Sequence, residues 1–201
     1  MKKLILNFKS KDSKKIKNPK FFLRGKGANL SEMGRMGLPV PPGFTISTKV
    51  CEIFYKDKKK LNNDLIKHIR KELKVIEKDV SKKFGDLKNP LLLSVRSGAR
   101  VSMPGMMDTI LNLGLNDKTV SALALKTSNG RFAKDSYRRF IQMYGNVVMG
   151  VEGYHFEELI ENYKLTKGVL LDTDLDESDW DGLIEDFKRT VKEKAKKDFP
   201  Q

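Results

Sequence analysis

The sequence predicts an α+β protein that is built in two parts. Residues 1–115 contain short apolar runs typical of strands, together with amphipathic helical patterns. Residues 116–201 contain helical patterns alone. A chain of 201 residues is long enough to bury a hydrophobic core. We therefore expect a small sheet with helices over residues 1–115, followed by an all-helical subdomain over residues 116–201.

The elements of the first part follow from apolar runs and from the residues that interrupt them. Strands are expected over residues 4–8 and 91–96. Three prolines and a glycine make residues 38–46 a rigid turn that leads into a short extended segment. Helices are expected over residues 27–37, 48–57 and 63–84. The last of these has apolar residues at three- and four-residue spacing, lysines on the other face and Gly85 as its stop.

The second part reads as four helices, over residues 117–127, 131–149, 154–166 and 178–199. Asp135 and Arg139 stand four residues apart and are expected to form an ion pair on one helix face. The acidic residues from Asp176 onward suit the N-terminus of the last helix. That helix has an apolar stripe, which consists of Trp180, Leu183, Ile184, Phe187 and Val191.

The charge is uneven along the chain. Residues 1–100 carry 26 Lys and Arg against nine Asp and Glu, whereas residues 101–201 carry 14 against 17. Such asymmetry can indicate nucleic-acid binding, but the aromatic residues that stack on bases do not alternate with the lysines. We interpret the lysines as solvated helix faces beside a polyphosphate site, and expect no nucleic-acid partner.

Cysteine usage and hydropathy limit the compartment. The single cysteine, Cys51, excludes a disulfide framework and lies in an apolar helical pattern, so we expect it to pack in the core. No apolar run approaches the roughly 20 residues that span a bilayer. We expect a cytoplasmic protein with no membrane partner. His68 and His155 lack cysteines or paired acidic residues at ligand spacing, so no metal site is expected in this chain.

The most informative stretch runs from Ser94 to Asp117. The strand over residues 91–96 ends on Arg96, a planar and permanently charged group that suits phosphate oxygens. In the loop that follows, Gly105 can expose backbone amides to a ligand and Thr109 can donate a hydroxyl. Asp108 could orient this loop, approach a metal or act as a turn residue. A turn between two strands is the competing interpretation of the whole stretch.

A second candidate is Lys26, which lies between two glycines at the start of a helix. A helix N-terminus offers free amides and partial positive charge, and the lysine adds a mobile ammonium group. The spacing is not that of a Walker P-loop. A surface lysine in a flexible turn is the alternative.

The amino-acid sequence of four blocks resembles the ATP-binding domain of pyruvate, phosphate dikinase. The blocks are residues 25–30 (GKGANL), 37–44 (GLPVPPGF), 94–117 (SVRSGARVSMPGMMDTILNLGLND) and 131–144 (RFAKDSYRRFIQMY). Arg24 and Gly98 depart from the family pattern without removing a charged group. The resemblance implies a partial ATP-grasp first lobe, followed by a helical subdomain of the same domain. It also implies that Lys26 and Arg96 contact ATP phosphates, that the 103–109 loop borders ATP and that Arg139 lies near the transferred phosphates. A solvated helix arginine is the competing role for Arg139.

The family interconverts ATP, pyruvate and phosphate with AMP, phosphoenolpyruvate and pyrophosphate, through a phosphohistidine. The resemblance implies ATP and Mg²⁺ as cofactors of the full enzyme. It implies the phosphohistidine and pyruvate domains as partners, and a homodimer formed through them. No counterpart of the phosphoacceptor histidine or of the acidic magnesium ligands is found here. We therefore expect an N-terminal fragment that has no catalytic residue of its own and is inactive alone. A nonenzymatic interaction module and a basic nucleic-acid binder are the alternatives.

Overall fold

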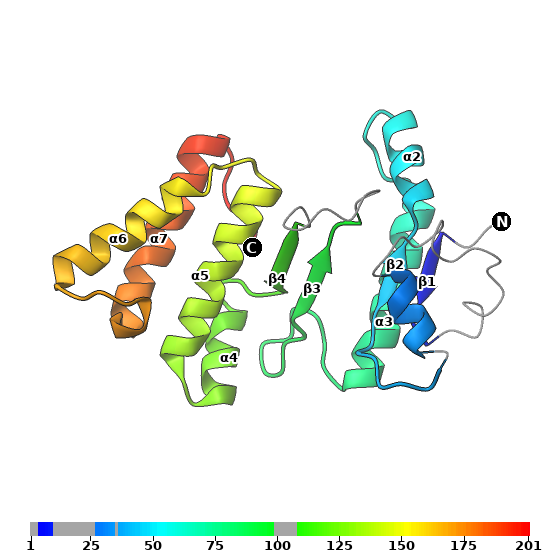
Figure 1. Ribbon diagram of the computed structural model, residues 1–201, viewed down its shortest axis with the longest axis horizontal. Coiled ribbons are helices and arrows are strands. Elements are labelled where there is room, and N and C mark those ends of the chain that lie inside the picture. Colours follow the sequence, from blue (N-terminus) through cyan, green and yellow to red (C-terminus); the bar gives the residue numbers. More distant parts are fainter. Residues whose placement is uncertain (1–3, 10–26, 35, 99–107) are drawn as a thin grey trace. The chain divides into compact units, whose positions relative to one another are not determined.

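The computed structural model describes residues 4–9, 27–34, 36–98 and 108–201 (Figure 1). They form two compact units: the first holds the described residues up to Ser81 together with residues 97–98, and the second holds residues 82–96 and 108–201. Both units combine helices with one small antiparallel sheet. The α+β class is therefore confirmed.

The first unit has a two-stranded sheet beside helices. Strand β1 (Ile5–Asn7) pairs antiparallel with β2 (Phe44–Ile46). Two helices follow, α2 (Thr48–Lys56) and α3 (Asn63–Val80), and residues 27–34 are also helical. The small core contains Ile5, Val50 and Leu65. The strand and helix expectations for this region are therefore confirmed in kind, with shorter strands than the sequence predicts.

Helix α3 ends four residues earlier than its apolar pattern predicts. Its last residue is Val80, and Ser81 takes a left-handed conformation with φ 52°. The expected continuation to Phe84 is wrong because the chain turns back here: the Leu91 amide donates to the Lys83 carbonyl at 2.9 Å. The ring of Phe84 packs instead beside Gly114, where a Cβ would come within 3.1 Å of it. Tertiary packing thus overrides the local helical spacing.

The second unit begins with an antiparallel pair, β3 (Leu93–Arg96) and β4 (Thr109–Leu113). The helices that follow are α4 (Thr119–Thr127), α5 (Gly130–Val147), α6 (Tyr154–Lys167) and α7 (Glu177–Ala195), with a short 3-10 helix η2 (Asp172–Asp174) before α7. Each expected helix is confirmed to within a few residues at its ends. Asp176 caps α7, as its acidic neighbourhood indicated, by accepting from the Ser178 and Asp179 amides.

The core of the second unit lies where α5 and α7 pack together, with α6 beside α7 and β4 against α5 (Figure 1). Tyr137, Trp180 and Phe187 are almost wholly buried there. Gly145 lets α5 come close to its neighbours, because a Cβ at this position would lie 2.9 Å from the Phe156 ring. The apolar stripe expected on α7 is confirmed, since all five of its residues are buried.

The strands β3 and β4 belong to the same compact unit as the helices. Ile110 and Leu115 are part of the helical core, and the Asn112 side-chain amide donates to the Ser136 carbonyl of α5 at 3.4 Å. The compact units therefore do not separate at residue 115. The division of the chain into an α/β part over residues 1–115 and a helical subdomain over residues 116–201 stays a prediction.

Cys51 does not pack in a core, contrary to the expectation. It is exposed on α2, where Val50 is the buried residue. A short helix buries only a narrow stripe of side chains. In α2 the neighbouring residue Val50 lies on that stripe, and Cys51 lies outside it.

Candidate functional site

Arg96 and Thr109 occupy opposite positions in the β3–β4 pair. The preceding pair in the register is Val95 with Ile110, and Ile110 is buried in the helical core. Side chains alternate between the two faces of a strand, and directly opposite residues share a face. Arg96 and Thr109 therefore lie together on the face that is turned away from Ile110.

This pair lies at one end of the sheet, because Arg96 is the last residue of β3 and Thr109 is the first residue of β4. Residues 97 and 98 follow Arg96, and Asp108 directly precedes Thr109 and is exposed. Three of the six predicted site residues are thus brought to one end of the sheet: Arg96, Asp108 and Thr109. Residues 99–107 of the connecting loop, which include Gly105, lie outside the described residues.

Arg96 is exposed, and among the described residues the structure gives it no carboxylate partner. An arginine that is locked into an internal ion pair would be a poor phosphate ligand, because binding would have to break that pair. Arg96 is therefore placed as an anion-binding group requires, at a strand end and beside a hydroxyl.

Lys26 also lies outside the described residues. The residue after it, Gly27, is the first described residue of a helical stretch over residues 27–34. A Cβ at Gly27 would lie 2.7 Å from the Thr45 hydroxyl oxygen on β2, so this position needs a glycine for packing. That Lys26 and Arg96 both contact the phosphates of ATP stays a prediction.

Arg139 lies on α5, and its pairing with Asp135 is confirmed. The Arg139 Nε donates to the Asp135 Oδ2 at 3.1 Å, and 58% of the arginine side chain is exposed. The other Asp135 oxygen, Oδ1, accepts from Arg138. One carboxylate thus holds two neighbouring arginines.

Arg138 is the functional candidate that the sequence reasoning missed. The sequence places it on a helix next to Arg139 and assigns it no role, but only 5% of its side chain is exposed. Its guanidinium lies 4.6 Å from the centre of the Trp180 ring and 3.9 Å from the Asp172 carboxylate. Burial lowers the pKa of Arg138, and the Asp135 carboxylate counteracts this. Helical periodicity could have predicted this burial, because a projection of α5 puts Arg138 at the edge of the buried stripe and Arg139 on the opposite face.

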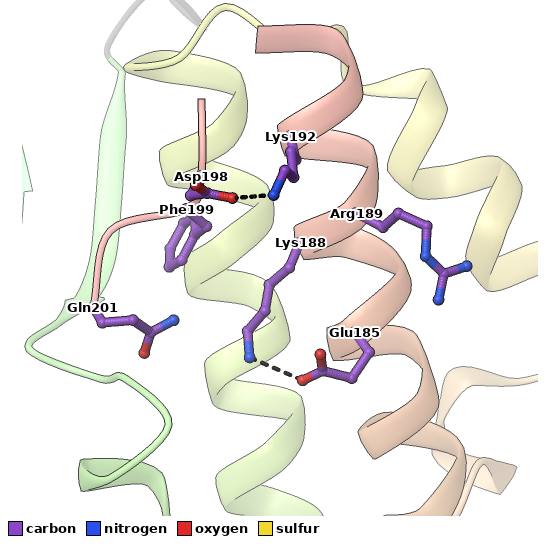
Figure 2. Close-up of a pocket in the computed structure, with 7 residues that line it drawn as sticks. All are labelled: Glu185, Lys188, Arg189, Lys192, Asp198, Phe199 and Gln201. Carbon is purple, nitrogen blue, oxygen red and sulfur yellow. Dashed lines mark hydrogen bonds and ion pairs between the residues drawn. The ribbon is translucent and has the colours of Figure 1, made fainter. Parts of the chain in front are cut away.

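A surface cavity of about 390 Å³ lies elsewhere, along α7 and the C-terminal segment (Figure 2). Three cations line it, but each is paired with a carboxylate. Lys188 bonds to Glu185 at 2.9 Å, Lys192 to Asp198 at 2.9 Å and Arg189 to Asp186 at 3.0 Å. None of the predicted site residues lines this cavity. Its cations are already neutralised, so we do not assign it to phosphate binding.

The described part of the chain holds neither a metal-binding cluster nor a membrane-spanning helix. No group of three or more His, Cys, Asp or Glu side chains is arranged to hold a metal ion there. Within the same residues, no helix is both long and apolar enough to cross a membrane.

The chain is similar in sequence to one family of known proteins. The sequence model of the family described as "Pyruvate phosphate dikinase, AMP/ATP-binding domain" matches residues 22–70. The chain is also 51% identical, over 199 residues, to the chloroplastic pyruvate, phosphate dikinase of Flaveria pringlei, which covers 99% of this chain and 21% of that protein. It is 53% identical over 180 residues to pyruvate, phosphate dikinase of Clostridium symbiosum, covering 89% of this chain and 21% of that protein.

Over nearly its whole length the chain is therefore similar to part of a pyruvate, phosphate dikinase, and residues 22–70 are similar to the AMP/ATP-binding domain of that family. A third dikinase, from Entamoeba histolytica, is 50% identical over 181 residues, which are 90% of this chain and 20% of that protein. The chain therefore spans about a fifth of the length of the dikinases it matches. The family match includes Lys26, whereas Arg96, Asp108, Thr109 and Arg139 fall in the stretch where the whole-length similarity alone applies.

Proposed function

We propose that this chain supplies one side of the ATP site of a pyruvate, phosphate dikinase. Such an enzyme is a phosphotransferase that interconverts ATP, pyruvate and phosphate with AMP, phosphoenolpyruvate and pyrophosphate. The observation that carries the proposal is the position of Arg96, exposed at a strand end and opposite Thr109, in a chain about half identical to dikinases. The chain alone is inactive in this proposal, because the phosphohistidine has no counterpart in it.

The proposed roles follow from the chemistry of each group. Lys26 and Arg96 offset negative charge on the polyphosphate as a bridging bond breaks, and Arg139 lies near the transferred phosphates. Gly105 lets backbone amides approach the nucleotide, and Thr109 donates its hydroxyl to a phosphate oxygen. Asp108 orients the loop between them. Fixed charges of this kind stabilise the transition state because they need not reorganise during the reaction.

Magnesium, when bound with ATP, would neutralise part of the phosphate charge. The described residues offer no cluster that fits a metal, so we assign the ion no ligand in this chain. The remaining dikinase domains are the proposed protein partners, and they would also form the homodimer. The proposed compartment is the cytoplasm, although relatives named as chloroplastic are among the matches.

The proposal is tested on the complete dikinase that contains this chain. Arg96→Ala should abolish AMP formation from ATP, and should leave phosphoryl exchange between phosphoenolpyruvate and pyruvate intact, because Arg96 serves the nucleotide site alone. The control is Arg70→Ala, which removes another exposed arginine, on α3, and should change neither reaction. Equal loss of both reactions in Arg96→Ala would place the role of Arg96 elsewhere.

A further inference from the structure

Asp135 connects a buried arginine to an exposed one. It lies on α5 with 19% of its side chain exposed. Its Oδ1 accepts from Arg138, and its Oδ2 accepts from the Arg139 Nε at 3.1 Å. Each oxygen therefore bonds to a different arginine, and the two arginines differ more than tenfold in exposure, at 5% and 58% of the side chain.

The buried side of this arrangement is held by several elements. Arg138 lies over the Trp180 ring of α7 at 4.6 Å and donates to Gln142 at 3.2 Å. It is also 3.9 Å from Asp172 of η2, which in turn accepts from Lys164 of α6 at 3.3 Å. A guanidinium with partners on α5, α7 and η2 has little freedom to move. Asp135 therefore receives a fixed position from the core of the helical unit.

The exposed side leaves a phosphate-binding edge available. Arg139 is bonded to Asp135 through Nε, and its two terminal nitrogens have no hydrogen-bond or carboxylate partner among the described residues. The guanidinium fork binds phosphate oxygens through pairs of adjacent nitrogens, so the terminal pair can still form a bidentate contact. Holding Nε fixes the plane and direction of that pair.

We propose that Asp135 is a positioning residue, which orients Arg139 toward a phosphate group of ATP. This inference rests on the proposed function of Arg139. Two arginines and one carboxylate keep a net charge of +1, so the buried Arg138 offsets the negative charge that Asp135 places beside the phosphate site. Asp135 thus contributes orientation, and its own charge opposes phosphate binding.

The charge of Asp135 and its positioning role predict opposite effects when the carboxylate is removed, so one substitution can distinguish them. Asp135→Asn removes a negative charge, which by electrostatics alone would strengthen ATP binding. The amide has one acceptor oxygen in place of two, so one arginine loses its partner. If Asp135 positions Arg139, kcat for AMP formation in the complete dikinase falls, by up to about 100-fold for a misplacement of roughly 1 Å. The phosphoenolpyruvate–pyruvate exchange keeps its rate.

A double-mutant cycle separates positioning from a general structural role. Asp135→Asn is introduced into both the wild type and Arg139→Ala, and kcat and KM for ATP are measured in each. We expect the loss in the wild type and no further loss in the Arg139→Ala background. An equal loss in both backgrounds, or a faster reaction in the single variant, would overturn the inference. If Asp135→Asn fails to fold because Arg138 is left unpaired, Asp135→Glu keeps a carboxylate there, shifts it by one methylene and goes through the same cycle.

The proposed function and this inference fail differently. An unchanged rate of AMP formation in Arg139→Ala alone would remove Arg139 from the nucleotide site, and the positioning role of Asp135 with it. A large loss in Arg139→Ala, combined with an unchanged rate in Asp135→Asn, would keep the site and reject the positioning role.

Discussion

Arg96 and Thr109 lie directly opposite each other in the register of β3 and β4, although residues 97–108 separate them in the sequence. Their pairing follows from Ile110, which is buried in the helical core and therefore directs the next pair to the other face of the sheet. The arginine and the hydroxyl that we propose for phosphate binding are thus brought to one face of the sheet by the packing of an apolar neighbour.

Replacing Thr109 with valine should weaken the ATP reaction without weakening the fold. Valine keeps the β-branched shape that suits a strand, so unfolding should change by less than about 0.5 kcal/mol. Loss of the hydroxyl should lower kcat/KM for ATP about fivefold, or roughly 1 kcal/mol. AMP formation by the complete dikinase and urea unfolding of the 201-residue chain provide the two measurements. An unchanged kcat/KM would remove Thr109 from the site.

The isolated 201-residue chain should bind Mg-ATP weakly and should show no phosphotransfer. It offers cationic groups, but no acidic cluster for the metal among its described residues. In the proposed function, the opposing surface that excludes water from the phosphates belongs to the rest of the enzyme. Calorimetry should show no binding as tight as about 1 μM, and a coupled phosphoenolpyruvate assay should show no turnover. Micromolar affinity or measurable turnover would contradict the division of the site between this chain and the rest of the protein.

The neighbouring arginines Arg138 and Arg139 should differ sharply in their effect on stability, although they share one carboxylate. Arg138→Ala removes a buried partner and its stacking on Trp180, so we expect a loss of about 3 kcal/mol, the lower end of the range for a broken buried pair. Arg139→Ala should cost less than about 1 kcal/mol, because that side chain is mostly in solvent. Urea unfolding followed by circular dichroism measures both. Similar losses would show that Arg138 is not held as the structure describes.

Stability of the helical unit should fall above pH 10 through Tyr137. Burial, as the largest cause, raises the pKa of this phenol, with Asp117 adding to the effect. The folded state therefore keeps a proton that the unfolded state releases near pH 10, so the stabilisation present below that pH is lost as the pH rises, at up to about 1.4 kcal/mol per pH unit. Trp180, the one tryptophan, reports unfolding of this unit. The control is Tyr137→Phe, which should show a shallower decline because the lysines still titrate; an identical decline would exclude Tyr137 as the cause.

The sequence by itself determined the helices and their ends where local chemistry decides them. Asp176 caps α7 because its carboxylate accepts hydrogen bonds from nearby backbone amides of the first turn. Asp135 and Arg139 pair because helical geometry places residues four apart on one face. The candidate residues were also chosen from the sequence, since a strand-end arginine beside a glycine-bearing loop is a local pattern.

Tertiary structure alone decided the features that depend on distant partners. Ser81 ends α3 early because Phe84 packs beside Gly114 and the chain reverses between Lys83 and Leu91. Arg138 is buried because Trp180, far along the sequence, lies over it. The pairing of Arg96 with Thr109 likewise required a register that no local pattern specifies. Local propensity acts over a few residues, whereas burial and pairing depend on which surfaces meet once the chain has folded.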